Sequence, residues 1–419
     1  MNMDSIFDSL RRGTEQLSLQ NATEKNAALK AVCRSLKANK EAIFKANEED
    51  VKLARAKGTK ESLIDRLSLN EKKLADIIAG VESIILQTDP IGEETCGWKT
   101  PGGLHIRQVR VPVGVVAIIY ESRPNVTVDA FALAYKSANA ILLRGSSSAL
   151  NSNMAIVKAI KEGLASVKGG IPEAVELAPC KSHDEVTEIL TAVGKVDLVL
   201  PRGSAKLIKT VVETAKVPVI ETGSGVCHLY VDQSADLDMA ARIAVNGKIQ
   251  RPGVCNALEC IVVNKEIAAD FIPKLAAAFD GKVEVHADEE SYPYFEKAAY
   301  NKLVHAQDQD FGFEFLDLIC AIKTVASIDQ AIEYINTHNT KHSESIITNN
   351  MANARLFQAK IDASCVYVNA STRFTDGGEF GFGAELGIST QKIHARGPMG
   401  IKALTTTKYL IDGNGQIRE

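Results

Sequence analysis

The spacing of hydrophobic residues changes along the chain. As far as about residue 86 they recur three or four positions apart, which predicts amphipathic helices, one of them opening at residues 21–24. Residues 104–111 instead alternate apolar and polar, the period of a half-exposed strand. A Thr-rich stretch at 402–410 alternates in the same way. We expect these two strands to pair, either within the chain or across subunits.

From residue 115 onward, short apolar segments alternate with longer amphipathic ones. We expect strands at 115–120, 140–143, 174–177, 196–200, 217–220 and 229–231, with helices at 126–137, 147–167, 184–193 and 204–215. Near-continuous apolar strands joined by crossover helices are typical of a buried parallel sheet. This predicts a doubly wound, Rossmann-like domain that binds its ligands at the carboxyl ends of the strands.

The second half of the chain repeats this α/β pattern. Strands are expected at 259–263, 283–286, 345–348 and 365–369, with helices at 237–246, 267–279, 328–336 and 351–360. A Gly-rich stretch at 376–387 is expected to form a loop over a site. The usual GxGxxG fingerprint is absent, since neither Gly223-Ser224-Gly225 nor Gly381-Phe382-Gly383 continues it. A dinucleotide would therefore bind differently from the way it binds in a standard dehydrogenase.

Composition narrows the class of protein. The 419 residues exceed what one core usually serves, so two or more domains are expected. An apolar share of 45%, a charged share of 24% and a net charge of −4 suit a soluble globular protein and favour neither nucleic acid nor a membrane surface as partner. We see no signal peptide and no apolar run near the roughly 20 residues of a membrane helix, so we expect a cytoplasmic protein.

The eight cysteines include one candidate nucleophile. None forms a CxxC pair and no metal-binding constellation is evident, so most are expected to be inert core residues in a reducing compartment. Cys255 differs because Arg251, Pro252 and Gly253 precede it in a loop that enters an apolar strand. A nearby cation raises the thiolate fraction, and the thiolate is the nucleophile. For an isolated cysteine, the alternative of a small buried hydrophobe would be favoured.

With these features in place, the chain resembles the aldehyde dehydrogenase superfamily over its whole length. The residues that carry the resemblance are Pro-Val-Gly-Val at 112–115, Glu-Ser-Arg-Pro-Asn-Val-Thr at 121–127, Leu-Leu-Arg-Gly-Ser-Ser at 142–147, Leu-Pro-Arg-Gly-Ser at 200–204, Glu-Thr-Gly at 221–223, Arg-Pro-Gly-Val-Cys-Asn at 251–256 and Asn-Ala-Ser-Thr-Arg-Phe-Thr-Asp-Gly at 369–377. Their occurrence in the right order makes the match specific.

The resemblance implies a fold and a domain plan. It implies an aldehyde-dehydrogenase-like α/β fold in which residues 1–98 and 112–225 form a Rossmann-like NADPH-binding domain. Residues 226–400 would form an α/β catalytic domain that contains the Cys255 nucleophile. Residues 99–111 and 401–419 would form a small β element for oligomerisation, which implies a homo-oligomer, a dimer or a tetramer.

The resemblance is strongest to the acyl-phosphate-reducing branch of the superfamily, and it implies a reaction. NADPH would reduce L-glutamyl 5-phosphate to L-glutamate 5-semialdehyde with release of phosphate, the second step of proline biosynthesis from glutamate. Chemically, the Cys255 thiolate attacks the acyl phosphate to give a thioester, and the cofactor supplies the hydride. The chain carries no kinase segment, so the substrate would come from a separate glutamate kinase.

Residue by residue, the resemblance implies two catalytic groups and a cofactor site. Asn125 matches the asparagine whose amide helps to form an oxyanion hole beside Cys255, and a helix N-cap is the alternative. Arg144, Ser146 and Ser147 would hold the adenosine ribose, with Ser147 in place of a glutamate that would repel a 2′-phosphate, so NADPH is favoured over NADH. The alternative is a solvated turn.

The remaining matched residues are harder to place. Gly203 and Ser204 open a helix whose amides suit a pyrophosphate, with an ordinary N-cap turn as the alternative. Glu221 aligns with the base of aldehyde-oxidising relatives, a role that would hydrolyse the thioester, and Glu314 with the glutamate that holds the nicotinamide ribose. The arginines expected to clamp the anionic groups of the substrate are Arg123, Arg251 and Arg373, although arginines are usually solvated.

Two other functions stay open at this point. The first is another aldehyde or acyl-CoA dehydrogenase of the same superfamily. The second is a catalytically inactive nucleotide-binding scaffold. The Ser-Arg-Pro-Asn and Ser-Thr-Arg-Phe segments and Ser147 favour the phosphate reductase, and intact Cys255, Asn125 and Gly203 argue against the scaffold. His228 and His342 are candidate proton donors, although most histidines are structural.

Overall fold

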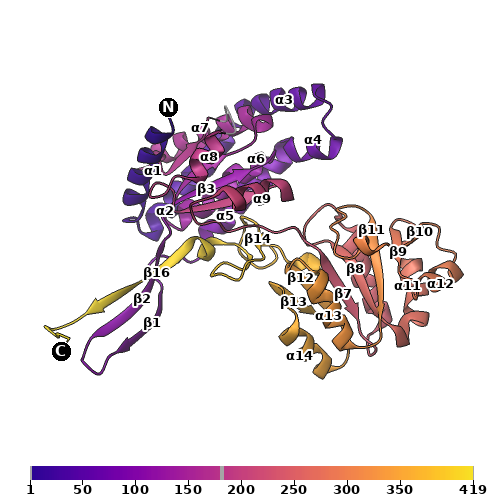
Figure 1. Cartoon of the computed structure of the whole chain (residues 1–419). Helices are drawn as coiled ribbons and strands as arrows, with labels where there is room; N and C mark the ends of the chain where they lie inside the picture. The colour runs from indigo at the N-terminus through magenta and orange to yellow at the C-terminus, as the bar shows by residue number, and fades with distance from the viewer. Residues whose placement is uncertain (1, 180–183, 419) are drawn as a thin grey trace. The chain divides into compact units, whose positions relative to one another are not determined.

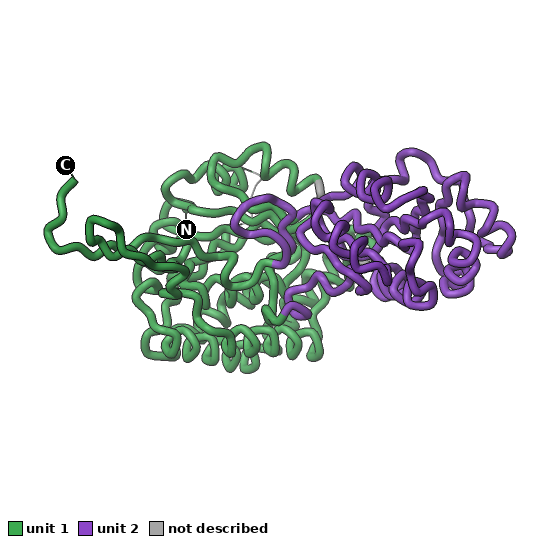
Figure 2. Tube along the Cα trace, turned by 90° about the horizontal axis from the view of Figure 1, so that it is seen from below, with its two compact units in different colours: residues 1–222, 381–387, 399–419 green, residues 223–380, 388–398 purple. Residues whose placement is uncertain are grey.

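The computed structural model describes residues 2–179 and 184–418, which places Cys180, one of the cysteines expected in the core, outside the described residues. The chain forms two compact units, drawn in different colours in Figure 2. Unit 1 comprises Met1–Thr222, Gly381–Gly387 and Met399–Glu419, and unit 2 comprises Gly223–Phe380 and Ile388–Pro398. The first boundary between the units was expected after residue 225 and is observed after Thr222. Near its end the chain returns to unit 1 twice, at Gly381–Gly387 and at Met399–Glu419.

Unit 1 is built on a four-stranded parallel sheet in the order β5-β4-β3-β6 (Figure 1). The strands are β3 (Val115–Tyr120), β4 (Ala140–Arg144), β5 (Val175–Leu177) and β6 (Leu198–Arg202), and every residue of β3 is buried. The strand order reverses at β3, because β4 and β5 extend the sheet on one side and β6 on the other. In a doubly wound sheet a ligand binds at the carboxyl ends of the strands beside such a reversal.

The sheet of unit 1 is covered by helices. Helices α6 (Pro124–Lys136), α7 (Leu150–Ala165), α9 (Ala205–Thr214) and α1 (Met3–Leu17) contact the strands directly. A further layer packs on α6 and α7 and confirms the helices predicted before residue 86. It consists of α2 (Ala22–Ala38), α3 (Lys40–Ala56) and α5 (Glu71–Leu86), with the short helix α4 (Glu61–Leu67) on α3; the short helix α8 (Asp184–Leu190) packs on α9 instead.

A separate three-stranded antiparallel sheet extends from unit 1 (Figure 1). It contains β1 (Glu94–Lys99), β2 (His105–Pro112) and β16 (Thr405–Asp412), and the register runs from Thr405 opposite Pro112 to Asp412 opposite His105. The predicted pairing of the two alternating stretches is therefore confirmed within the chain. The sequence interpretation missed β1, because Glu94–Lys99 is exposed along its whole length and has no apolar stripe.

Unit 2 contains a seven-stranded parallel sheet in the order β10-β9-β11-β8-β7-β12-β13. Its strands are β7 (Cys227–Val231), β8 (Leu258–Asn264), β9 (Glu284–Ala287), β10 (Leu303–His305), β11 (Ile319–Val325), β12 (Ser343–Ile347) and β13 (Cys365–Val368). Successive residues of β7 and β8 contribute to two separate cores: Leu229 and Ile261 to one, Tyr230 and Val262 to the other. The helices are α10 (Leu237–Ile249), α11 (Ala268–Phe279), α12 (Tyr292–Lys297), α13 (Ile328–His338) and α14 (Met351–Lys360).

Two predicted strands need correction, and two strands of unit 2, β10 and β11, were not predicted. The strand expected at 217–220 is wrong, because only Val219 bridges Val199, and the neighbouring Pro218 has no N–H to donate to a ladder. The strand expected at 229–231 exists as β7, but it belongs to the sheet of unit 2 rather than to the Rossmann-like sheet. Strand β11 was missed because Lys323 and Thr324 interrupt its apolar run. In the structure the Lys323 side chain forms an ion pair with Asp288, and the Thr324 amide donates a hydrogen bond to the same carboxylate.

Candidate active site

Cys255 lies in the segment between the end of α10 and the start of β8, and it is partly exposed. Its backbone is packed against the segment that enters β7. A Cβ atom placed on Gly225 would lie 1.4 Å from the carbonyl oxygen of Cys255, so only glycine fits there. The Cys227 thiol donates a hydrogen bond of 3.3 Å to the same oxygen. Gly225 and Cys227 therefore both contact the backbone carbonyl of Cys255 and restrict its position.

The other described cysteines separate into one exposed residue and five buried ones. Cys96 is exposed on β1, whereas Cys33, Cys227, Cys260, Cys320 and Cys365 are buried. Burial raises the pKa of the Cys33 thiol to about 11 and that of Cys320 to about 12, and it raises the pKa of Cys227 and Cys260 as well. These thiols keep their protons, and the expectation that they are inert core residues holds for them.

A network of hydrogen bonds joins the Cys255 segment to residues 371–376. The Asn256 amide donates to the carbonyl oxygen of Thr375 at 2.9 Å and to that of Arg373 at 3.3 Å, and the Thr372 hydroxyl donates to the Asn256 carbonyl at 2.8 Å. The Arg373 guanidinium in turn donates to Asn256 Oδ1 and, through Nε at 3.1 Å, to Gln250 Oε1. Two segments more than a hundred residues apart are therefore fastened together beside Cys255.

Arg373 is half-buried in this network, and burial lowers the pKa of its guanidinium. The second cause is the positive charge of Arg251, while Asp376 and Cys255 act in the opposite direction. Three predicted site residues, Cys255, Arg251 and Arg373, are therefore close enough to interact electrostatically in unit 2. Two guanidinium groups beside a thiol form a positive environment suited to an anionic substrate.

Arg123 and Asn125 lie in unit 1, where the carboxyl end of β3 leads into α6. The N-cap of α6 is Arg123, and its side chain makes no capping bond. Asn125 lies within the first turn, so the helix-cap alternative for Asn125 is wrong. Its Nδ2 instead donates at 3.2 Å to Asp129, a half-buried carboxyl one turn further on. Burial raises the pKa of Asp129 to about 6, against the opposing hydrogen bond from Asn125 and the charge of Arg202.

The residues predicted to hold adenosine ribose follow β4. The Arg144 guanidinium donates at 3.1 Å to the carbonyl of Gly145. The hydroxyl of Ser146 forms a cluster with those of Ser122 and Ser148, at 3.2 and 2.6 Å, and Ser122 and Ser148 are themselves 2.6 Å apart. These hydroxyl groups join the carboxyl ends of β3 and β4. Guanidinium and hydroxyl donors at this edge of the sheet fit a phosphate-bearing ligand.

Gly203 and Ser204 follow β6, and a carboxylate lies on them. Ser204 is the N-cap of α9, and its hydroxyl accepts from the amide of Leu207 at 3.4 Å. The Ser204 amide and hydroxyl donate to the two carboxylate oxygens of Glu121 at 3.1 and 2.8 Å. The N-cap alternative is therefore observed, and an anion does occupy this helix start. A pyrophosphate would have to share these donors with Glu121 or displace it.

The two histidines considered as proton donors are fully buried. His228 pairs through Nδ1 with Glu344 at 3.0 Å, and His342 lies 2.8 Å from the Ser343 hydroxyl. Burial lowers the pKa of His342 to about 4, so its ring is neutral at physiological pH. A structural role therefore fits His228 and His342 better than the role of a catalytic proton donor.

Comparison with known proteins settles the family. The family model described as the aldehyde dehydrogenase family matches residues 1–309 and 318–409. The chain belongs to the aldehyde dehydrogenase family. Gamma-glutamyl phosphate reductases from Dictyoglomus thermophilum and Lachnospira eligens are each 50% identical to it over 100% of both chains, and that of Clostridium botulinum is 52% identical over 96% of both.

Solved structures of this family are also similar. The crystal structure of gamma-glutamyl phosphate reductase from Thermotoga maritima has a TM-score of 0.96 and 46% identity, with 100% of both chains covered. An acetylating aldehyde dehydrogenase from Geobacillus thermoglucosidasius has a TM-score of 0.71 over 99% of this chain and 97% of its own, at 15% identity. The second likeness concerns the fold alone, and it agrees with the predicted aldehyde-dehydrogenase-like α/β architecture.

The family match leaves out residues 310–317, the segment that contains Glu314. In the structure the Glu314 carboxylate accepts a 2.6 Å hydrogen bond from the amide of Gly225, the glycine that packs behind Cys255. Burial raises the pKa of Glu314, and this hydrogen bond lowers it. Its alignment with the family glutamate that holds the nicotinamide ribose stays a prediction, as does the role of the half-buried Glu221.

Several residues of this site were not found from the sequence. Asp129 lies four positions after Asn125, on the same face of α6. That spacing is the one signal that would have identified it. The Arg202 guanidinium donates to the Leu386 carbonyl at 2.7 Å and so holds the Gly-rich 381–387 segment within unit 1. This contact between residues 184 positions apart had no sequence signal.

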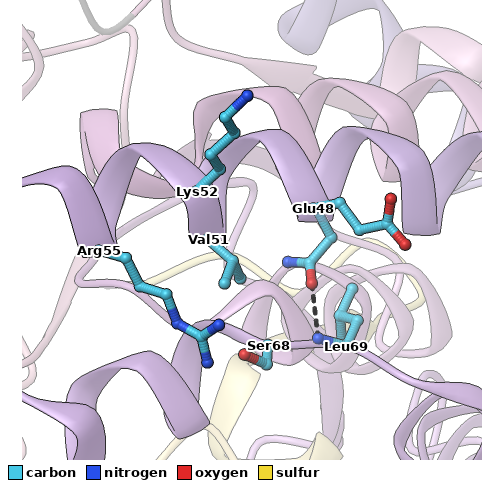
Figure 3. A pocket seen from close by; sticks show the side chains of 7 residues that line it. Glu48, Val51, Lys52, Arg55, Ser68 and Leu69 are labelled. Carbon is cyan, nitrogen blue, oxygen red and sulfur yellow. Dashed lines mark hydrogen bonds between the residues drawn. The ribbon is translucent and has the colours of Figure 1, made fainter.

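Two hollows lie in unit 1, and none of the predicted site residues is among those that line them. The first, of about 370 Å³, is lined by α3 and by Ser68 and Leu69. Figure 3 labels Val51 and Arg55 of α3 and the facing Ser68 and Leu69. Asn47 accepts from the Leu69 amide at 2.7 Å and donates to the Leu67 carbonyl and the Ser152 hydroxyl. These are structural bonds. The second hollow, of about 570 Å³, lies between α7 and the end of β5.

In the described part of the chain no helix is long and apolar enough to cross a membrane.

Proposed function

We propose that the protein reduces L-glutamyl 5-phosphate to L-glutamate 5-semialdehyde with NADPH and releases phosphate. This is the second step in making proline from glutamate. The observation that carries the proposal is the identity of about 50%, over the full length, with relatives named gamma-glutamyl phosphate reductase. The positive surroundings of Cys255 support it, because an acyl phosphate is an anionic substrate.

In the proposed mechanism Cys255 acts as the nucleophile. Its sulfur attacks the acyl carbon, a C–S bond forms, and phosphate leaves with the electron pair of the C–O bond. Arg373 and Arg251 bind the leaving phosphate or the substrate carboxylate, and Arg123 is proposed as a further clamp for an anionic group. Asn125 donates its amide to the carbonyl oxygen, where a single donor is worth about 3 kcal/mol in the transition state. NADPH, when bound, supplies the hydride that takes the thioester to the aldehyde level.

In the same mechanism neither Glu221 nor Asp129 acts as a general base. A general base beside the thioester would activate water and waste the acyl group, so Glu221 is proposed to orient groups rather than to act as a base. Asp129 holds the Nδ2 of Asn125 at 3.2 Å and so fixes the orientation of the amide.

The proposed cofactor site is the carboxyl edge of the unit 1 sheet. Arg144, Ser146 and Ser147 would bind the ribose and its 2′-phosphate, and Gly203 and Ser204 the pyrophosphate, provided that Glu121 yields. The hollow between α7 and the end of β5 begins at Leu150, three positions after Ser147 in the sequence. Its lining includes the apolar residues Leu150, Met154, Val157 and Pro179 and the charged residues Lys158, Lys161, Glu162 and Glu176. We propose that its apolar part holds the adenine ring.

Replacing Arg144 by alanine should raise the KM for NADPH about tenfold, because a guanidinium–phosphate contact is lost. The KM for glutamyl phosphate should stay within about twofold. Steady-state kinetics with NADH in place of NADPH provide the control, since NADH has no 2′-phosphate and should be little affected. Equal increases for both cofactors would remove Arg144 from 2′-phosphate binding.

The experiment that tests the function is the reverse reaction. Purified protein is mixed with glutamate 5-semialdehyde and NADP⁺, with and without inorganic phosphate, and the absorbance of the reduced cofactor is followed. We expect NADPH to form beyond one equivalent per Cys255 only with phosphate, because phosphate must attack the thioester to free Cys255 for the next turnover. Continued NADPH formation without phosphate would mean that water resolves the thioester, and the protein would then be an aldehyde-oxidising dehydrogenase with Glu221 as base.

We also propose that the sheet of β1, β2 and β16 mediates homo-oligomer formation. It presents Trp98, Tyr409 and Ile411 with 45%, 55% and 57% of their surface exposed, and Trp98 and Tyr409 are in edge-to-face contact. Exposed apolar side chains gathered on one face are typical of a protein interface. The proposal further includes a cytoplasmic location and a separate glutamate kinase that supplies the substrate.

The double substitution Tyr409→Glu and Ile411→Glu should lower the mass measured by light scattering. It places two charges in the proposed interface and leaves the backbone pairing of β16 intact. Lys408→Glu alters the neighbouring position, whose side chain points to the other face of the strand, and it should leave the mass unchanged. If the double variant keeps the mass of the wild type, this face is not the interface.

A further inference from the structure

The segment at 310–317, outside the family match, is anchored at its beginning. Asp310 ends a short 3-10 turn, and its carboxylate accepts from the amide of Gln307 at 2.8 Å. The same carboxylate lies 2.8 Å from Nδ1 of His286, whose Nε2 lies 2.9 Å from Glu284. The ring of His286 also packs edge-to-face against Phe315. A histidine between two carboxylates thus holds the start of the segment on strand β9.

The end of the segment is anchored by a buried ion pair. Lys248 on α10 and Glu259 on β8 lie 2.6 Å apart, with 0% and 1% of their side chains exposed. The second oxygen of Glu259 accepts the backbone amide of Leu316 at 3.3 Å. Leu316 has a left-handed backbone with φ +55°, a conformation that non-glycine residues adopt only when their surroundings impose it. The backbone two residues after Glu314 is therefore held in one place.

Between these two ends of the segment, Glu314 binds Gly225, the residue that packs against the Cys255 carbonyl. Its carboxylate accepts the Gly225 amide at 2.6 Å, a short charge-assisted bond. Gly225 has no room to move toward Cys255, because even a Cβ atom would collide with the Cys255 carbonyl. The thiol of Cys227, two residues along, donates to that same carbonyl. A displacement of Gly225 must consequently change the position of Cys255.

We propose that Glu314 is a positioning residue for Cys255, acting through Gly225, and that the Lys248–Glu259 pair holds the segment that presents it. The inference rests on the proposed function insofar as it takes Cys255 as the nucleophile. It differs from the expectation that Glu314 holds a ribose, because a positioning role operates without any cofactor. Glu314 and Gly225 both belong to unit 2, so the role is complete within that unit.

The test follows acylation of Cys255 without NADPH. p-Nitrophenyl acetate is added to the full-length protein; the Cys255 sulfur attacks the ester carbon, a C–S bond forms, and p-nitrophenolate leaves with the C–O electron pair. Glu314→Ala should slow this burst roughly tenfold, the loss expected for a charge-assisted hydrogen bond. Glu314→Gln retains an acceptor for the Gly225 amide and should stay within about threefold. Glu333→Ala, at an exposed position on α13, should have no effect.

The outcomes separate this inference from the proposed function. An unchanged burst in Glu314→Ala, with reductase turnover impaired only through a raised KM for NADPH, would overturn the positioning role. Equal slowing in the Gln and Ala variants would also overturn it, since the hydrogen bond would then be irrelevant. The nucleophile itself is tested by Cys255→Ser, which must abolish the burst whatever Glu314 does.

Discussion

Replacing Cys255 by serine should reduce phosphate-dependent NADPH formation by on the order of 10³-fold or more, since no other described thiol can take its place. A serine hydroxyl is far less ionised than a thiol and is the weaker nucleophile at neutral pH. The affinity for NADPH, measured by the fluorescence of the bound cofactor, should stay within about twofold. Cys255 lies in unit 2, whereas the residues proposed for the 2′-phosphate lie in unit 1.

The matched control is Cys96→Ser. Cys96 is exposed on β1, in unit 1, and its thiol lies 3.7 Å from Gln108. This variant should keep wild-type turnover and wild-type binding. Substantial turnover in Cys255→Ser would exclude a thioester on that residue. If NADPH binding were lost together with turnover, the variant would have damaged the fold rather than the chemistry.

The parts of the fold that the sequence predicted are those set by local periodicity. Strand β3 is a continuous apolar run with every residue buried, and it lies where expected. The alternation at 104–111 and 402–410 correctly predicted the pairing of β2 with β16. Such patterns act over a few residues and need no knowledge of distant neighbours. Strand β11 escaped because its Lys323 contacts Asp288, a partner that no local pattern indicates.

The candidate site divides in the same way. Cys255, Arg251 and Arg373 were selected by motif, and the structure brings them together. The contacts that hold them come from residues far apart in sequence. Glu314 and Gly225 are 89 positions apart, and Asn256 and Thr375 are 119 apart. Glu121 likewise accepts from the amide of Ser204 at the start of α9, 83 positions further on. A single sequence carries no signal for such pairings.

The buried Lys248–Glu259 pair gives the second large effect. Lys248→Met should lower the free energy of unfolding of unit 2 by about 3–5 kcal/mol at pH 8, because Glu259 loses its buried cationic partner and must either carry an unpaired charge in the core or take up a proton. The double variant Lys248→Met/Glu259→Leu should recover most of this loss, since apolar residues of similar volume replace both charges. Lys274→Met, which removes an exposed partner of Asp238, should have no measurable effect.

The loss in Lys248→Met should depend on pH in a definite direction. Burial raises the pKa of Glu259 from 4.5 to about 7 even with Lys248 present, and the loss of that positive charge raises it further. A folded-state pKa above the unfolded one gives stability that is complete below about pH 4.5 and is lost as the pH rises through the folded pKa. The variant should thus be closer to wild type at pH 5.5, where Glu259 is protonated and neutral, than at pH 8.

The measurement must report on unit 2. The single tryptophan, Trp98, lies on β1 in unit 1, so its fluorescence would follow the wrong unit. Native-state hydrogen exchange of peptides from β8 is suitable, because all its residues are buried. An equal destabilisation at both pH values would show that Glu259 stays ionised without Lys248. A double variant as unstable as Lys248→Met would mean that the Leu316 contact with Glu259, rather than the unpaired charge, dominates the energetics.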